Sequence, residues 1–114
     1  MEVYLHTDHN ITGHEALTTR VVRGVRAGLA DLEDRVTRVD VHLSDESARR
    51  HTGNDLRCLL DAKLVGQAHV TATDDAATVE EALSHSIHRL RRLLESRQGR
   101  IEDRTARASI RAER

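Results

Sequence analysis

Apolar and polar residues alternate along four short stretches of the chain, with the period of two that is typical of strands burying one face. The stretches span residues 3–7, 36–43, 56–64 and 68–73. In the second stretch, Val39, Val41 and Leu43 alternate with polar residues. We therefore predict four β-strands, each with one apolar face, and a polar loop over residues 44–54.

Two longer stretches carry apolar residues at the three- and four-residue spacing of an amphipathic helix. The two apolar stripes are Leu17, Val21, Val25, Leu29 and Leu32, and Val79, Leu83, Ile87, Leu90 and Leu94. We predict that the first helix runs to about Leu32. The second is predicted to run to about Gln98, because Gly99 is a natural stop.

Both predicted helices begin with a recognisable start signal. Thr12-x-x-Glu15 and Thr78-x-x-Glu81 match the capping box, in which two side chains satisfy free amide groups at a helix start. Asp74-Asp75 precedes the second box, and we expect this acidic pair to open the second helix.

The order of elements is β-α-β-β-β-α, which predicts an α+β fold. Each strand has one apolar face, so both helices should pack on one face of a four-stranded mixed sheet. A right-handed crossover makes the first two strands parallel, and the others follow as antiparallel neighbours. We predict one domain over residues 1–98. Residues 99–114 form a polar, Arg-rich tail that is either a helical extension or disordered.

Composition narrows the class of protein. The 114 residues carry a net charge of -1, whereas proteins that neutralise many phosphates usually show a basic excess. Any nucleic-acid surface must therefore arise by local segregation of charge. The single cysteine, Cys58, excludes an internal disulfide and a metal site built on a cysteine pair. We read no signal peptide and no membrane-spanning stretch, and expect a cytoplasmic protein.

The sequence contains none of the common catalytic motifs. It has no Gly-rich phosphate loop, no Gly-x-Ser-x-Gly elbow and no HExxH helix. Cys58 lies on the apolar face of a strand, where a cysteine is far more often a packing residue than a nucleophile. We expect no enzyme, no cofactor and no small-molecule substrate; a small enzyme using His42, Asp45 or Cys58 is the minor alternative.

Polar residues gather at the ends of the predicted strands. The topology brings together Asp8, His9, Ser44, Asp45, Glu46, Asn54 and Asp55. Such groups are possible metal ligands, but loop ends are also polar because they are solvated and capped. His85-x-x-His88 lies among arginines, which repel a cation. We therefore predict no metal.

Basic residues lie opposite the apolar stripe of each helix. The candidate RNA-binding residues are Arg20, Arg23, Arg26, His85, His88, Arg89 and Arg92. Two neighbouring helices with such arcs would form a groove that follows a phosphate backbone, and the planar fork of arginine suits phosphate. On charge alone, an ordinary solvated helix surface explains these residues more simply.

Several runs of residues, together with the element order, resemble one bacterial protein family. The runs are Leu29-Ala30-Asp31-Leu32-Glu33, Arg89-Leu90-Arg91-Arg92-Leu93-Leu94, Thr7-Asp8-His9-Asn10-Ile11, Gly13-His14-Glu15, Val41-His42-Leu43-Ser44-Asp45-Glu46 and Asn54-Asp55-x-Arg57-Cys58. From about Val3 to Gln98, the chain resembles the short hibernation-promoting factors and ribosome-associated inhibitor proteins (the HPF/RaiA family), in a divergent branch.

The resemblance implies a fold like that of a double-stranded-RNA-binding domain. It also implies stress-linked inhibition of translation by non-enzymatic binding to small-subunit rRNA, in the channel used by messenger and transfer RNA. Longer members pair ribosomes through an extra C-terminal domain, and we do not expect dimerisation by that route.

The basic helix positions carry RNA binding in this family. Arg89 and Arg92 match its pattern, whereas Gly28 and Asp31 stand where typical members have lysine. The three arginines of the first helix supply the basic arc instead. The alternative function is a protein-interaction or metal-responsive module on the same fold without RNA binding, which the near-neutral charge and the polar strand ends favour.

Overall fold

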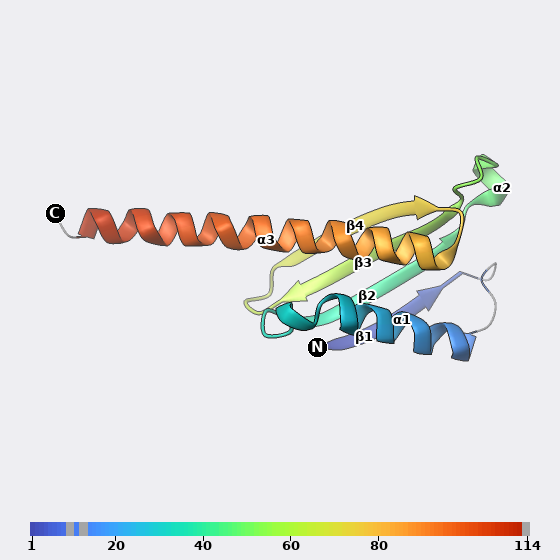
Figure 1. Ribbon diagram of the computed structural model, residues 1–114, viewed down its shortest axis with the longest axis horizontal. Helices are drawn as coiled ribbons and strands as arrows, with labels where there is room; N and C mark the ends of the chain where they lie inside the picture. Colours follow the sequence, from blue (N-terminus) through green and yellow to red (C-terminus); the bar gives the residue numbers. More distant parts are fainter. Residues whose placement is uncertain (9–10, 12–13, 113–114) are drawn as a thin grey trace.

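The computed structural model describes residues 1–8, 11 and 14–112, and confirms the predicted α+β fold (Figure 1). The predicted order of strands and main helices is present, with two short helical segments added. The elements are β1 (Glu2–Thr7), α1 (His14–Gly28), η1 (Ala30–Leu32), β2 (Val36–Asp45), α2 (Ser47–Arg50), β3 (Leu56–Leu64), β4 (His69–Ala76) and α3 (Val79–Ala112).

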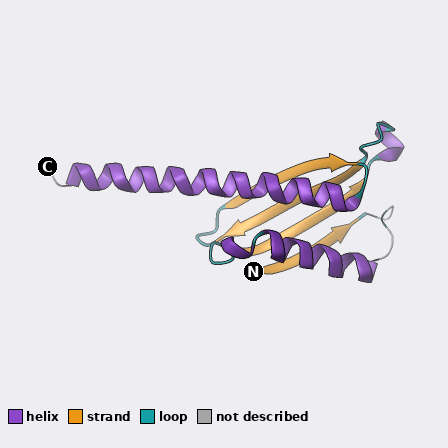
Figure 2. Cartoon of the chain, in the orientation of Figure 1, coloured by secondary structure: helices purple, strands orange, loops and turns teal. Residues whose placement is uncertain are grey.

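The four strands form one sheet in the order β1-β2-β3-β4. β1 and β2 are parallel, and the other two neighbouring pairs are antiparallel, as predicted. Figure 2 shows α1 and α3 side by side on one face of this sheet. The fold therefore has two layers, and the other face of the sheet is open.

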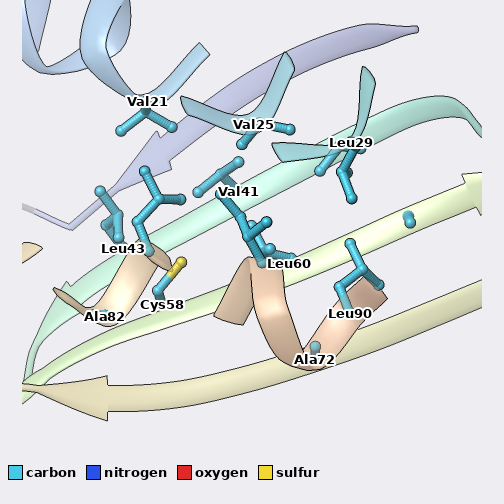
Figure 3. Close-up of a cluster of buried hydrophobic side chains, with 14 of the residues drawn as sticks. Val21, Val25, Leu29, Val41, Leu43, Cys58, Leu60, Ala72, Ala82 and Leu90 are labelled. Carbon is cyan, nitrogen blue, oxygen red and sulfur yellow. The ribbon is translucent and has the colours of Figure 1, made fainter. Parts of the chain in front are cut away.

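The core lies between the two helices and the covered face of the sheet (Figure 3). Val25 of α1, Leu29 just after α1, Val41 of β2 and Leu90 of α3 are fully buried. Cys58 is also fully buried, and burial raises the pKa of its thiol to about 11. This cysteine is therefore a packing residue.

The two helices approach closely where α1 ends. A Cβ atom placed on Gly28 would lie 2.6 Å from Cγ2 of Ile87, which is far inside van der Waals contact. Gly28 therefore permits the close approach of α3. The packing that this allows offsets the low helix propensity of glycine.

Arg91 of α3 holds the end of α1 in place. Its guanidinium donates one hydrogen bond of 2.8 Å to the Gly28 carbonyl and two, of 2.6 and 2.9 Å, to the Asp31 carboxylate. The Arg91 hydrogen bonds lower the pKa of Asp31 to about 2. From the loop after η1, Arg35 donates to the Leu94 carbonyl at 2.8 Å, so a second arginine ties this corner to α3.

Several predicted element boundaries are wrong. The α-helix of α1 ends at Gly28 and the chain continues as the 3₁₀ turn η1. The short helix α2 interrupts the predicted loop over residues 44–54. Thr12, which we expected to cap α1, lies outside the described residues.

Asp74 and Asp75 belong to β4 and do not open α3. The Asp75 carboxylate accepts a hydrogen bond of 2.9 Å from Nε of Arg57 on the neighbouring strand. This cross-strand pair stabilises the pairing of β3 with β4. The predicted cap of α3 is present, because the Thr78 hydroxyl accepts a hydrogen bond from the Glu81 amide at 3.2 Å.

The second helix is longer than predicted, because α3 runs through Gly99 to Ala112. A glycine inside a helix costs only about 1 kcal/mol relative to alanine, and no proline follows it. Residues 100–112 are rich in arginine and alanine, which are good helix formers. The molecule is consequently elongated, at 61 × 27 × 19 Å (Figure 1).

The close approach at Gly28 gives a first prediction. Gly28→Ala should destabilise the fold by about 1–2 kcal/mol, because the new Cβ overlaps Ile87, although alanine is the better helix former. In an Ile87→Ala background the same substitution should be neutral or stabilising, because the overlapping methyl group is gone. Urea unfolding of the four proteins gives both values, and equal effects in the two backgrounds would contradict the packing argument.

The Arg91 contacts give a second prediction. Arg91→Met keeps much of the aliphatic stem but leaves the Gly28 carbonyl and the Asp31 carboxylate without their donor. We expect a lower Tm and earlier hydrogen exchange at the end of α1. Arg92→Met, on the next and more exposed position of α3, is the control and should leave Tm nearly unchanged.

Candidate nucleic-acid interface

On the β1–β2 side of the open sheet face, the basic side chains are paired with an acid of the same face. Arg38 donates to both carboxylate oxygens of Asp40 at 2.9 Å, and its guanidinium lies 4.2 Å from the centre of the Tyr4 ring. His6 lies 2.8 Å from Asp40 and its ring stacks on that of His42 at 4.6 Å. The Arg38 hydrogen bonds, with His6, lower the pKa of Asp40 to about 2.

On the β3–β4 side of this face, basic side chains are again paired with acids. Arg57 is paired with Asp75, and Nδ1 of His69 lies 3.1 Å from the Asp61 carboxylate. Among the described residues, the arginines of the open face are thus engaged by acids of the same face. This surface offers little free positive charge to an anionic partner.

The outer flank of α3 is different. Four of the predicted RNA-binding residues lie together there and line a hollow of about 860 Å³: His85, His88, Arg89 and Arg92. Their spacing along one helix explains the grouping, because residues three, four and seven apart share a face. Asp74 of β4 and Ser96 of α3 also line this hollow.

Most of these four side chains have no acidic partner among the described residues. Arg89 is 59% exposed and stands 4.0 Å from Asp74, at the limit of an ion pair. Within the part of the chain that the structure describes, Arg92, His85 and His88 form no ion pair with another described residue. The outer flank of α3 is therefore a surface on which cations remain available.

The three predicted arginines of α1 do not join this group. Arg20 forms an ion pair with Glu80 of α3. Arg23 and Arg26 are exposed and line a separate hollow of about 430 Å³ on the opposite flank of α1, beside Thr18 and Val22. The structure therefore divides the seven predicted residues into two separate cationic surfaces, with Arg20 between them.

The groove between α1 and α3 is mainly apolar. It measures about 360 Å³ and is lined by Leu17, Val21, Gly24, Gly28, Val79, Leu83, Ser84 and Ile87, with Arg20 and Glu80. The expected single cationic groove across both helices is therefore wrong. The reason is packing: the residues that bring the helices together occupy the facing surfaces, which turns the free arginines outward.

The predicted gathering of polar residues at the strand ends is present, but they satisfy the backbone. The Asp8 carboxylate accepts a hydrogen bond from the Asp45 amide at 3.3 Å, and the Asp55 carboxylate accepts from the Thr52 amide at 3.1 Å. Asp45 accepts from the Ser47 amide at 2.9 Å, which lowers the pKa of its carboxyl.

His9 lies outside the described residues. Among the residues that the structure describes, no group of three or more histidine, cysteine or acidic side chains is arranged to hold a metal ion. Over the same residues, no helix combines the length and apolar character that crossing a membrane requires.

Two acids next to the cations were missed by the sequence reasoning. Glu80 pairs with Arg20, sixty positions earlier, and Asp74 reaches the hollow from β4. No spacing along the chain signals either contact, since both depend on how α3 lies on the sheet.

A model of one protein family, described as "Sigma 54 modulation protein / S30EA ribosomal protein", matches residues 5–102. The chain belongs to this family. The family predicted from the sequence runs is thereby confirmed. The match covers the second half of β1, all of α1, β2, β3 and β4, and most of α3, including the four residues of the hollow.

Solved structures similar to this family member have the same fold. The N-terminal domain of Thermus thermophilus Protein Y aligns with a TM-score of 0.62 and 21% identity, over 79% of this chain and 91% of that one. A ribosomal subunit interface protein from Coxiella burnetii aligns with a TM-score of 0.64 and 16% identity, over 87% of this chain and 99% of that one. No curated protein matches the sequence.

The paired charges of the open face give a third prediction. Asp40→Asn should lower the free energy of unfolding at pH 7 by about 1 kcal/mol, because Arg38 loses its charged acceptor. The depressed pKa of Asp40 stabilises the fold above pH 4, and this contribution disappears as pH falls towards 2. Urea unfolding from pH 7 to 2.5 should therefore show the two proteins converging at the acidic end, and a constant difference would refute the assignment.

Proposed function

We propose that this protein binds small-subunit ribosomal RNA without catalysis and inhibits translation as a stress-linked hibernation factor. Membership of a family described as sigma 54 modulation and S30EA ribosomal proteins supports a ribosomal partner. One similar solved structure is of a ribosomal subunit interface protein. The observation that carries the RNA assignment is the group of available cations on the outer flank of α3.

The chemistry of that surface suits phosphate. Arg89 and Arg92 each offer a planar fork that donates two hydrogen bonds to one phosphate group. His85 and His88 add ring nitrogens able to donate hydrogen bonds to phosphate or to ribose hydroxyls. Because the described lining of the hollow contains no tyrosine, we expect it to recognise backbone and shape instead of stacking unpaired bases.

The remainder of the fold holds these side chains in position. The opposite flank of α3 is anchored by Arg91 and by the buried Leu90 and Leu94, so little backbone conformational entropy is lost when RNA binds. Arg23 and Arg26 on α1 provide a second, separate set of possible phosphate contacts. We propose that the protein acts sterically, by occupying a channel of the small subunit in the cytoplasm.

We assign this activity to the domain formed by residues 1–98. The alternative, an interaction module without RNA binding, draws support from the self-paired charges of the open sheet face. Co-sedimentation with ribosomal fractions of stressed cells at low salt distinguishes the two, because only the first hypothesis predicts it.

The fourth prediction tests the RNA surface directly. Replacing Arg89 and Arg92 together with alanine should weaken binding to purified small subunits about tenfold or more at 0.1 M salt. The slope of log affinity against log salt should become shallower by up to about one unit for each lost contact, on the scale known for duplex DNA.

The matched control removes two cations from the open sheet face, as Arg57→Ala with Lys63→Ala. This variant has the same net charge, so it should lose far less affinity if the location of the charges matters. Circular dichroism confirms that each variant is folded. Equal losses in both double variants, or no binding by the unaltered protein at low salt, would refute the assignment.

A further inference from the structure

Glu80 forms an ion pair with Arg20, the arginine that lies between the two cationic surfaces. The side chains of Arg20 and Glu80 are 60% and 62% exposed and pair across the mouth of the groove between α1 and α3. Neither is needed to fill the core, because the groove behind them is lined by apolar residues of both helices. The pair is therefore an exposed contact that a competing anion can reach.

A second carboxylate has a similar place in the hollow of α3. Asp74 is 31% exposed, lies 4.0 Å from Arg89 and is oriented by the Asp75 amide, which donates to its carboxylate at 2.8 Å. Two positions of the candidate RNA interface thus each have an acid beside the arginine, supplied by β4 or by the first turn of α3.

We propose that Glu80, assisted by Asp74, is an internal competitor of RNA phosphate that sets the affinity of this interface. The proposal rests on the proposed RNA-binding function. A carboxylate and a phosphate use the same donors of an arginine fork, so RNA gains Arg20 only by displacing Glu80. The displaced carboxylate then stands beside a polyanion, which opposes binding.

This exchange has a measurable signature in salt dependence. Each arginine–phosphate contact releases cations that are condensed on the RNA. A carboxylate displaced by that contact stands beside the polyanion and attracts a cation in turn. The net release of ions is therefore smaller than for a free arginine, so both affinity and salt slope are reduced. The competitor makes binding weaker and more readily reversible than the number of arginines suggests.

Glu80→Gln and Glu81→Gln form the decisive comparison. The two acids are neighbours in the first turn of α3 and are both exposed, so each substitution removes the same charge from the same helix end. Of these two acids as the structure describes them, Glu80 alone pairs with Arg20. With purified small subunits at 0.1 M salt, Glu80→Gln should bind roughly three- to tenfold more tightly, with a steeper salt slope, whereas Glu81→Gln should gain less than about twofold.

A double-mutant cycle tests whether the gain in affinity depends on Arg20. In an Arg20→Ala background, Glu80→Gln should lose most of its gain, because the arginine that it releases is absent. If Glu80→Gln and Glu81→Gln bind alike, or if the gain survives the loss of Arg20, the competitor proposal is overturned while RNA binding stands. If the unaltered protein and every variant fail to bind at low salt, the proposed function itself fails.

Discussion

The close packing of α1 against α3 on a single face of the sheet is the constraint on which the rest of the structure depends. It requires a residue without a side chain at position 28, where Ile87 leaves no room for one. It is secured by Arg91, which reaches back to the end of α1. Because apolar residues of both helices line the groove between them, Arg23, Arg26, Arg89 and Arg92 lie on the outer flanks.

The distribution of charge follows from that arrangement. A net charge of -1 gives no hint of an RNA-binding protein, yet the balance is not uniform over the surface. Arg38 and Arg57 on the open sheet face are paired with acids on the same face, and Arg91 is used inside the fold. On the outer flank of α3, Arg92 forms no ion pair with another described residue and Arg89 is only weakly paired, at 4.0 Å from Asp74, so local segregation supplies what the overall composition does not.

The acids at the proposed interface also affect its affinity for phosphate. In a highly basic protein, phosphate binding is limited mainly by the number of contacts. In the proposed RNA interface, phosphate competes for arginine with carboxylates that the fold holds nearby, so affinity depends on exchange between two kinds of anion. Because the exchange lowers the salt slope, such an interface is expected to be weaker and to respond less steeply to ionic strength than one built from unpaired arginines.

The sequence by itself determined the strands, the two main helices, the sheet order and the family, because apolar periodicity and capping residues are local and each strand buries one face. It also brought His85, His88, Arg89 and Arg92 together, since their spacing on one helix is fixed by the helix itself. Only the tertiary structure decided that Arg20 belongs to Glu80, that Arg23 and Arg26 lie on another flank, and that the groove between the helices is apolar. Those contacts join residues far apart in the chain, and their partners are set by how two helices pack, which no local pattern encodes.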